Sequence, residues 1–112
     1  IGMNRDIQFG PLVMFGLGGI YVNLLKDVSF RLANYITPKS AFDMIGETRA
    51  YMLLKGFRGE SPSDIESVVD VILRISKLAL DFQEIVELDI NPLFAYEHGV
   101  AAVDIKMTIS WE

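Results

Sequence analysis

Three side chains near the end of the chain carry oxygens of the kind that bind hard metal ions: Asp89, Asn91 and Asp104. Each lies in a stretch where apolar and polar residues alternate, and a period of two is typical of strands that bury one face. The alternation predicts two strands that present these side chains on one polar face. Mg²⁺ takes one or two carboxylate or amide oxygens from a protein and completes its shell with phosphates and water. The residue types therefore favour a site for a divalent cation and the phosphates that it carries.

A turn at residues 96–99 is expected to join the two strands into a β-hairpin over residues 85–109. The turn ends on Gly99, which can adopt the positive φ of a glycine bulge without strain. Pro92 follows Asn91 directly. Because proline fixes φ and lacks an N–H, we expect the strand to end or bend there, with Asn91 held at its exit.

The turn also fixes which residues lie opposite each other. With the loop centred between residues 97 and 98, the numbers of opposite residues sum to 195, so Asn91 faces Asp104 and Asp89 faces Lys106. Such partners lie about 4.5–5.5 Å apart at Cβ, close enough to share one ion. The solvent face of any antiparallel sheet shows the same alternation, however, so periodicity alone leaves a plain surface strand as an alternative.

The composition narrows the classes of function. The chain has 112 residues, is 51% hydrophobic and has a net charge of −5, which fits one domain or a piece of a larger protein and disfavours nucleic-acid binding. It has no cysteine, as expected of a cytoplasmic protein and incompatible with disulfides or thiolate chemistry. Residues 7–25 carry no charge, but their glycines and polar groups favour buried strands over a membrane helix.

The remaining segments predict the elements that position the hairpin. Strands are expected at residues 12–15, 20–25 and 28–33, from their apolar and β-branched content. Thr37 and Pro38 predict the start of a helix, which Gly46 interrupts before a restart. A second helix is expected from the start signals at 61–64, with Ser63 and Glu66 as a possible capping box, to about Phe82. This order predicts an α+β fold: a mostly antiparallel sheet with two helices on one face.

The glycine-rich segment at residues 16–19 admits two interpretations. No Lys-Ser/Thr pair follows it, so it is not a P-loop. A tight turn between strands is one interpretation. The other is that the N–H groups of Gly18 and Gly19 approach a phosphate, assisted by Arg31.

Several separate motifs, in order along nearly the whole chain, resemble the ATP-grasp domain of NDP-forming acyl-CoA synthetases, which include ADP-forming acetate–CoA ligase. The motifs are ELDINPL at 87–93 and AVD at 102–104, QFGP at 8–11, MFGLGGI at 14–20, LKDVSFR at 25–31 and LLKG at 53–56. The resemblance is to the C-terminal lobe of that domain. It implies that residues 1–112 are a fragment of a longer protein, as a chain beginning with Ile1 also suggests.

The resemblance implies roles for the polar residues. Asn91 and Asp104 stand where the family binds Mg²⁺ with the phosphates of ATP or ADP. Asp89 stands where succinyl-CoA relatives carry a glutamate near the phosphorylated histidine, and its shorter side chain weakens or shifts that role. His98, the only histidine, is expected to be an exposed residue of the hairpin turn. The resemblance implies that the phosphorylated histidine lies outside this segment, so no catalytic residue is expected within it.

The implied reaction is the reversible formation of ATP from acyl-CoA, ADP and phosphate, through acyl phosphate and a phosphohistidine. The chain would need two partners: an N-terminal ATP-grasp lobe, and a CoA-binding α subunit or domain that brings the acyl-CoA. Two alternatives stay open. One is a lobe of an ATP-grasp ligase that joins a carboxylate to an amine, and the other is a regulatory ATP-grasp module fused to an acetyltransferase.

Overall fold

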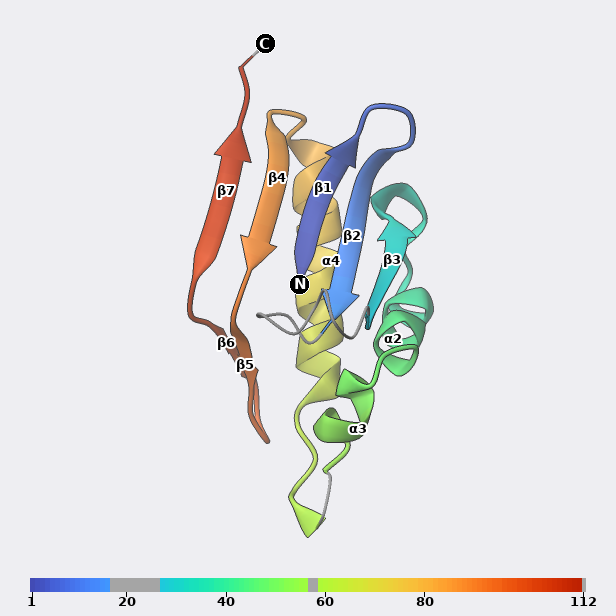
Figure 1. Cartoon of the computed structure of the whole chain (residues 1–112), viewed down its shortest axis with the longest axis vertical. Coiled ribbons are helices and arrows are strands. Elements are labelled where there is room, and N and C mark those ends of the chain that lie inside the picture. Colours follow the sequence, from blue (N-terminus) through green and yellow to red (C-terminus); the bar gives the residue numbers. More distant parts are fainter. Residues whose placement is uncertain (17–26, 57–58, 112) are drawn as a thin grey trace.

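The computed structural model describes residues 1–16, 27–56 and 59–111. Five strands form an antiparallel sheet in the order β3-β2-β1-β4-β7, and two short strands form a separate hairpin (Figure 1). The strands are β1 (Gly2–Asp6), β2 (Gly10–Gly16), β3 (Val28–Leu32), β4 (Ile85–Ile90), β5 (Leu93–Ala95), β6 (Val100–Ala102) and β7 (Ile105–Ile109). The helices are α2 (Pro38–Gly46), α3 (Ala50–Leu54) and α4 (Ile65–Asp81), with a 3-10 turn, η2 (Ala33–Tyr35).

The predicted α+β class is confirmed, although the central strand was missed. β1 pairs with β2 on one side and with β4 on the other. Its polar run of Asn4, Arg5 and Asp6 hides it from a search for apolar stretches. The predicted strands at 12–15 and 28–33 correspond to β2 and β3, whereas the one at 20–25 lies outside the described residues.

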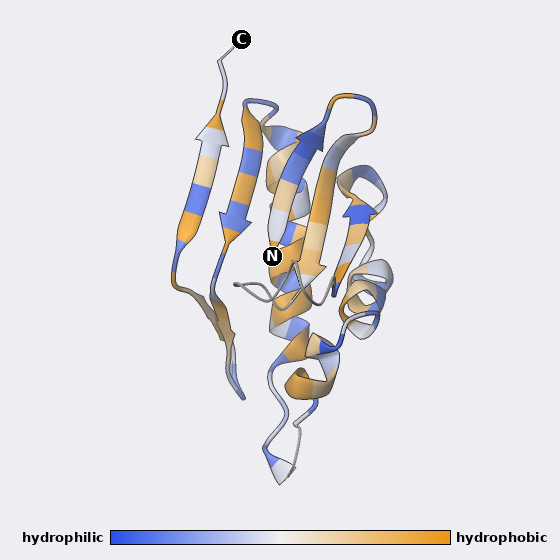
Figure 2. Cartoon of the chain, viewed as in Figure 1, coloured by the Kyte–Doolittle hydropathy of each residue, from blue (hydrophilic) through white to orange (hydrophobic). Residues whose placement is uncertain are grey.

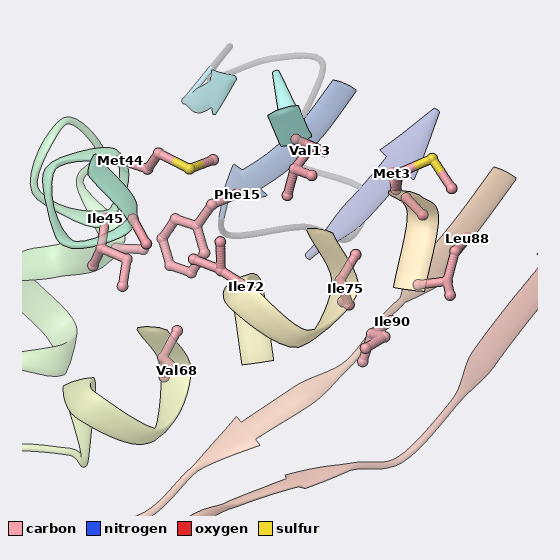
Figure 3. Close-up of a cluster of buried hydrophobic side chains, with 14 of the residues drawn as sticks. Met3, Val13, Phe15, Met44, Ile45, Val68, Ile72, Ile75, Leu88 and Ile90 are labelled. Atoms are coloured by element: carbon pink, nitrogen blue, oxygen red, sulfur yellow. The ribbon is translucent and has the colours of Figure 1, made fainter. Parts of the chain in front are cut away.

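The core lies between one face of the sheet and helices α2 and α4. Val13, Met3 and Leu88 are successive cross-strand neighbours, so their side chains point to the same face. All three are buried, in one cluster with Ile72 and Ile75 of α4 (Figure 3). Burying an aliphatic side chain of this size contributes about 1.5–3 kcal/mol, so this contact holds α4 on the sheet.

Helix α2 begins and ends where its sequence predicts. The Thr37 hydroxyl accepts a hydrogen bond from the Ser40 N–H, and the Ser40 side chain accepts one from the Thr37 N–H, which completes a capping box. Pro38 occupies the first turn and Gly46 is the last helical residue. The chain then restarts as the short helix α3, as expected from the weak helix propensity of glycine.

Helix α4 confirms the strongest periodicity in the sequence, with Val68, Ile72 and Ala79 buried on its inner face. Its N-cap is Asp64, whose carboxylate accepts a hydrogen bond from the Ser67 N–H. The alternative capping box of Ser63 and Glu66 is therefore not the one used. None of the helices in the described ranges is long and apolar enough to cross a membrane.

Arg5 ties the sheet to the far end of α4. Its guanidinium donates hydrogen bonds to the backbone carbonyls of Ala79 at 2.8 Å, Ile85 at 3.0 Å and Phe82 at 3.2 Å. The last carbonyls of a helix lack intrahelical partners, and a cation suits the negative end of the helix dipole. Arg5 thus acts as a C-terminal cap supplied by the central strand.

Candidate metal and nucleotide site

The predicted hairpin exists, with the predicted register. Opposite residues pair as Asp89 with Lys106 and Ile90 with Ile105, and beyond them Leu93 pairs with Ala102. A one-residue bulge shifts the register only at the far end, between Ile85 and Glu87. The turn closes with a hydrogen bond from the Tyr96 N–H to the Gly99 carbonyl, and Gly99 has the expected positive φ of 85°.

Pro92 divides the hairpin into two parts. β4 ends at Ile90 and β5 begins at Leu93, so the outer half leaves the five-stranded sheet as the β5–β6 hairpin (Figure 1). The prediction of a break at the proline is confirmed. Asn91 and Asp104 both lie at this junction, outside any strand.

The junction brings Asn91 and Asp104 side by side. The Asn91 N–H donates a 3.0 Å hydrogen bond to the Asp104 carbonyl, and the Val103 N–H donates one of 3.0 Å to the Pro92 carbonyl. Both polar side chains are exposed to solvent. Their backbones are therefore fixed against each other, while the exposed amide oxygen and carboxylate can coordinate a metal ion.

A cavity of about 620 Å³ adjoins one member of this pair. Asp89 and Asn91 contribute polar groups to its wall, and most other lining residues are apolar, including Met14, Leu53 and Phe94. Cavities of about 300–1,000 Å³ with apolar walls and few polar groups are typical of small-molecule sites. Asp104 is not among the lining residues, so the cavity reaches the pair from the Asn91 side.

Asp89 lies on the face of the sheet opposite the helices. Its cross-strand neighbours are Gly2 on β1 and Lys106 on β7. A Cβ at Gly2 would lie 3.3 Å from the Leu88 carbonyl oxygen and 3.6 Å from the Asp89 carboxylate. The absence of a side chain at Gly2 therefore leaves the Asp89 carboxylate accessible from the cavity.

Arg31 lies away from these residues. It pairs with Val13 in the register of β3 and β2, so its side chain points to the helix side of the sheet. β3 is the edge strand farthest from β7, and β2 and β1 separate it from β4. There it forms a bidentate ion pair with Glu47, which raises the pKa of Arg31 and lowers the pKa of Glu47. The structure does not bring Arg31 together with Asp89, Asn91 or Asp104, and its assistance to a phosphate stays a prediction.

Gly18 and Gly19 lie outside the described residues, but the residues on either side of the gap, Gly16 and Asp27, are described. A Cβ at Gly16 would lie 2.8 Å from the Asp27 carbonyl oxygen, a close approach that only glycine allows. The Asp27 carboxylate accepts hydrogen bonds of 3.0 and 2.8 Å from the Arg49 N–H. Gly16 and Val28, which lie on either side of the undescribed residues 17–26, both line the cavity.

Asp64 was predicted only as a helix start, yet it also holds the hairpin. Its carboxylate accepts a 2.8 Å hydrogen bond from the Gly99 N–H, and its own N–H donates one of 2.6 Å to the Tyr96 carbonyl. The Gly99 bond is the main cause of a lowered pKa at Asp64. A single N-cap residue thereby fixes the tip of the hairpin whose base carries Asn91 and Asp104. No local pattern in the sequence could reveal this contact between distant residues.

The donor set fits a metal that brings its own ligands. In the described ranges, no group of three or more His, Cys, Asp or Glu gathers in a way that could hold an ion. One carboxylate and one amide oxygen, both open to solvent, match the few protein ligands that Mg²⁺ takes when phosphates supply the others.

Comparison with known proteins identifies the family. The profile of the ATP-grasp domain matches residues 1–109. The chain belongs to this family. It is 52% identical over its full length to acetate–CoA ligase [ADP-forming] I of Archaeoglobus fulgidus, of which it covers 16%. It is 56% identical over 97% of its length to the β subunit of acetate–CoA ligase [ADP-forming] I of Pyrococcus furiosus, of which it covers 47%. The resemblance seen in the sequence is thus confirmed.

A solved relative gives the same fold. The chain superimposes with a TM-score of 0.92, at 47% identity, on the dinucleotide forming acetyl-coenzyme A synthetase 1 of Ca. Korarchaeum cryptofilum. That enzyme was solved in complex with coenzyme A and Mg-AMPPCP, with its phosphohistidine segment pointing towards the nucleotide binding site. The match covers 97% of this chain and 51% of that one. The chain therefore spans about half the length of the Pyrococcus β subunit and of this solved chain, and 16% of the Archaeoglobus ligase.

Proposed function

We propose that residues 1–112 are the C-terminal lobe of the ATP-grasp domain of an ADP-forming acyl-CoA synthetase, and that they bind Mg²⁺ with ATP or ADP. The observation that carries the proposal is the junction of Asn91 and Asp104 beside the cavity, in a chain this similar to an enzyme solved with Mg-AMPPCP. The reaction would be the reversible conversion of acyl-CoA, ADP and phosphate into the acid, ATP and CoA. We place the protein in the cytoplasm.

Asn91 and Asp104 would hold the metal, which supplies charge neutralisation for the nucleotide phosphates when bound. The protein's own contribution is positional. The hydrogen bond from the Asn91 N–H to the Asp104 carbonyl fixes the spacing of the two ligands, so little ordering is needed when phosphate arrives. Asp89, on the cavity wall, would contribute to the nucleotide and phosphate site beside the two metal ligands.

The rest of the active site would lie in other parts of the enzyme. A first ATP-grasp lobe would cover the nucleotide, and a CoA-binding α subunit or domain would bring the acyl-CoA and the phosphohistidine. Residues 1–112 alone are therefore expected to be inactive. Formation of ATP from acetyl-CoA, ADP and phosphate by this segment alone would disprove the half-site arrangement.

The relatives named above are acid–CoA ligases, and so is the 4-hydroxybutyrate–CoA ligase [ADP-forming] of Nitrosopumilus maritimus, 50% identical over 88% of the chain. These similarities favour CoA over an amine as the acceptor. They also favour a catalytic lobe over a regulatory module, since Asn91 and Asp104 are both present. Competition between CoA and a panel of amines, with the full-length enzyme, tests the choice of acceptor.

The metal site is tested by calorimetric titration of Mg-ADP into the full-length enzyme. Asp104→Ala is expected to weaken Mg-dependent ADP binding by at least about tenfold, the equivalent of about 1.4 kcal/mol. The matched control is Asp70→Ala, because Asp70 is an exposed acid on α4 that pairs with Arg74. Wild-type affinity in Asp104→Ala, with Mg²⁺ present, would disprove the assignment.

A further inference from the structure

Strand β7 presents an apolar row to solvent. Ile105, Met107 and Ile109 are 54%, 44% and 46% exposed, and they alternate with Lys106 and Thr108 along the strand. Figure 2 shows this edge strand banded with hydrophobic residues beside the body of the sheet. An exposed row of large aliphatic side chains is unusual on a finished protein surface and marks a contact face.

The row continues the buried core. Ile105, Met107 and Ile109 pair with Ile90, Leu88 and Ile85, which are only 7%, 4% and 6% exposed. Cross-strand partners point to the same face of a sheet, so the three β7 side chains lie on the side that the helices cover elsewhere. The apolar face of the sheet therefore extends one strand beyond the layer of helices that covers it.

The spacing of helices and strands explains where the cover ends. Helices pack about 8–10 Å apart, the width of two strands spaced about 4.8 Å apart. Helix α2 contacts β3 and β2, and α4 contacts β2 and β1. In the part of the chain that the structure describes, no helix lies over the edge strand β7 (Figure 1). The layer lacks one helix next to α4.

We infer that the row of Ile105, Met107 and Ile109, hereafter the β7 face, is covered by an amphipathic helix from the part of the parent chain outside residues 1–112. This inference rests on the proposed function, since it takes the chain to be one lobe of a longer polypeptide. The solved relative has about as many residues again beyond the matched half. A five-residue strand is about 17 Å long, which a helix of about 11 residues matches.

The chemistry of the β7 face favours this occupant over a second copy or a separate subunit. The row contains no charged or polar side chain, as in permanent contacts rather than transient ones. A second copy that paired strand to strand with β7 would satisfy its free backbone edge but would leave this face open. A helix from the same polypeptide covers the face at no cost in association entropy.

Single cysteines can report whether the β7 face is covered. Residues 1–112 contain no cysteine, so a cysteine-free full-length chain requires replacements only outside this segment. The site of interest is Met107→Cys. The matched control is Phe42→Cys on α2, since Phe42 is also 44% exposed and lies by the opposite edge of the sheet. We expect the thiol at position 107 to react with a maleimide at least about tenfold more slowly than the thiol at position 42, in that chain expressed without the CoA-binding partner.

Equal reaction rates for the two variants would overturn the inference. So would protection of the thiol at position 107 that appears only when the CoA-binding partner is added, or that is lost on dilution, because these results assign the β7 face to the partner or to a second copy. A photo-cross-linking residue at position 107, mapped by mass spectrometry, is expected to join a helical peptide of the same chain. The labelling needs no nucleotide, so its outcome is separate from that of the Mg-ADP titration.

Discussion

The carboxylate of Asp64 accepts a hydrogen bond from the backbone N–H of Gly99, 2.8 Å away and 35 residues later in the chain. The same carboxylate caps α4 through the Ser67 N–H. The β5–β6 hairpin is thus held at its tip by the start of α4 and at its base by the junction of Asn91 and Asp104. The position of the proposed metal ligands depends on both attachments.

The first prediction concerns this attachment. Asp64→Ala removes the acceptor, so the Gly99 amide should exchange with solvent at least about tenfold faster, because the hairpin tip opens locally. Hydrogen exchange measured by NMR resolves the Gly99 amide from the core amides of Leu88 and Met3. Asp70→Ala, elsewhere on α4, is the control and should change the exchange rate of none of these three amides. Unchanged exchange at Gly99 in Asp64→Ala would show that the tip is held by other contacts.

The second prediction is a pH dependence with a definite sign. Hydrogen bonds from Gly99 and Ser67 lower the pKa of Asp64 in the folded protein. The unfolded chain therefore binds the proton more readily, and the stabilisation is present above the unfolded pKa of about 3.9 and is lost as the pH falls through the lower folded value. Asp64→Asn keeps an acceptor oxygen but does not titrate.

Urea titrations at a series of pH values test this sign. The advantage of wild type over Asp64→Asn should be constant near neutral pH and should shrink below about pH 4. The difference between the two proteins cancels the other carboxylates, which titrate in both. An advantage that grows as the pH falls would contradict the direction assigned to the pKa of Asp64.

The third prediction concerns Arg5, which caps α4 from the central strand. Arg5→Met removes three hydrogen bonds from a charged donor and should lower the free energy of unfolding by about 2–3 kcal/mol. Arg5→Lys should restore only part of this, because an ammonium cannot reproduce the planar fork. Chemical denaturation measures both. Arg74→Met, which removes an exposed ion pair, should stay within about 0.5 kcal/mol of wild type.

The register of the hairpin could be predicted from the sequence because it depends on local facts. A glycine-ended turn sets the pairing, and Pro92 sets the break, so the neighbours Asn91 and Asp104 follow from their numbers alone. The start of α2 was predictable for the same reason, since Thr37, Pro38 and Ser40 satisfy the first helical N–H groups by themselves.

The remaining features depend on distant parts of the chain. β1 is central because β2 and β4 flank it, although Asn4 and Arg5 are residues typical of a surface. The face of the sheet to which the Arg31 side chain points follows from its pairing with Val13, and no local pattern in the sequence reveals this pairing. The cavity needs α3 beside the ends of β1, β2 and β4, and the second role of Asp64 needs the hairpin tip to reach α4.

The last prediction compares two glycines with opposite surroundings. Gly56 has a φ of 94°, and a Cβ there would lie 2.2 Å from the Glu60 carbonyl oxygen. Gly56→Ala should therefore lower the free energy of unfolding by about 2–4 kcal/mol, from backbone strain together with the clash. Gly46 ends α2 and a Cβ there would meet nothing within 4 Å, so Gly46→Ala should raise it by about 0.5–1 kcal/mol through helix propensity. Urea denaturation of both variants measures the two changes in the free energy of unfolding. Equal changes would contradict the conformations described for Gly56 and Gly46.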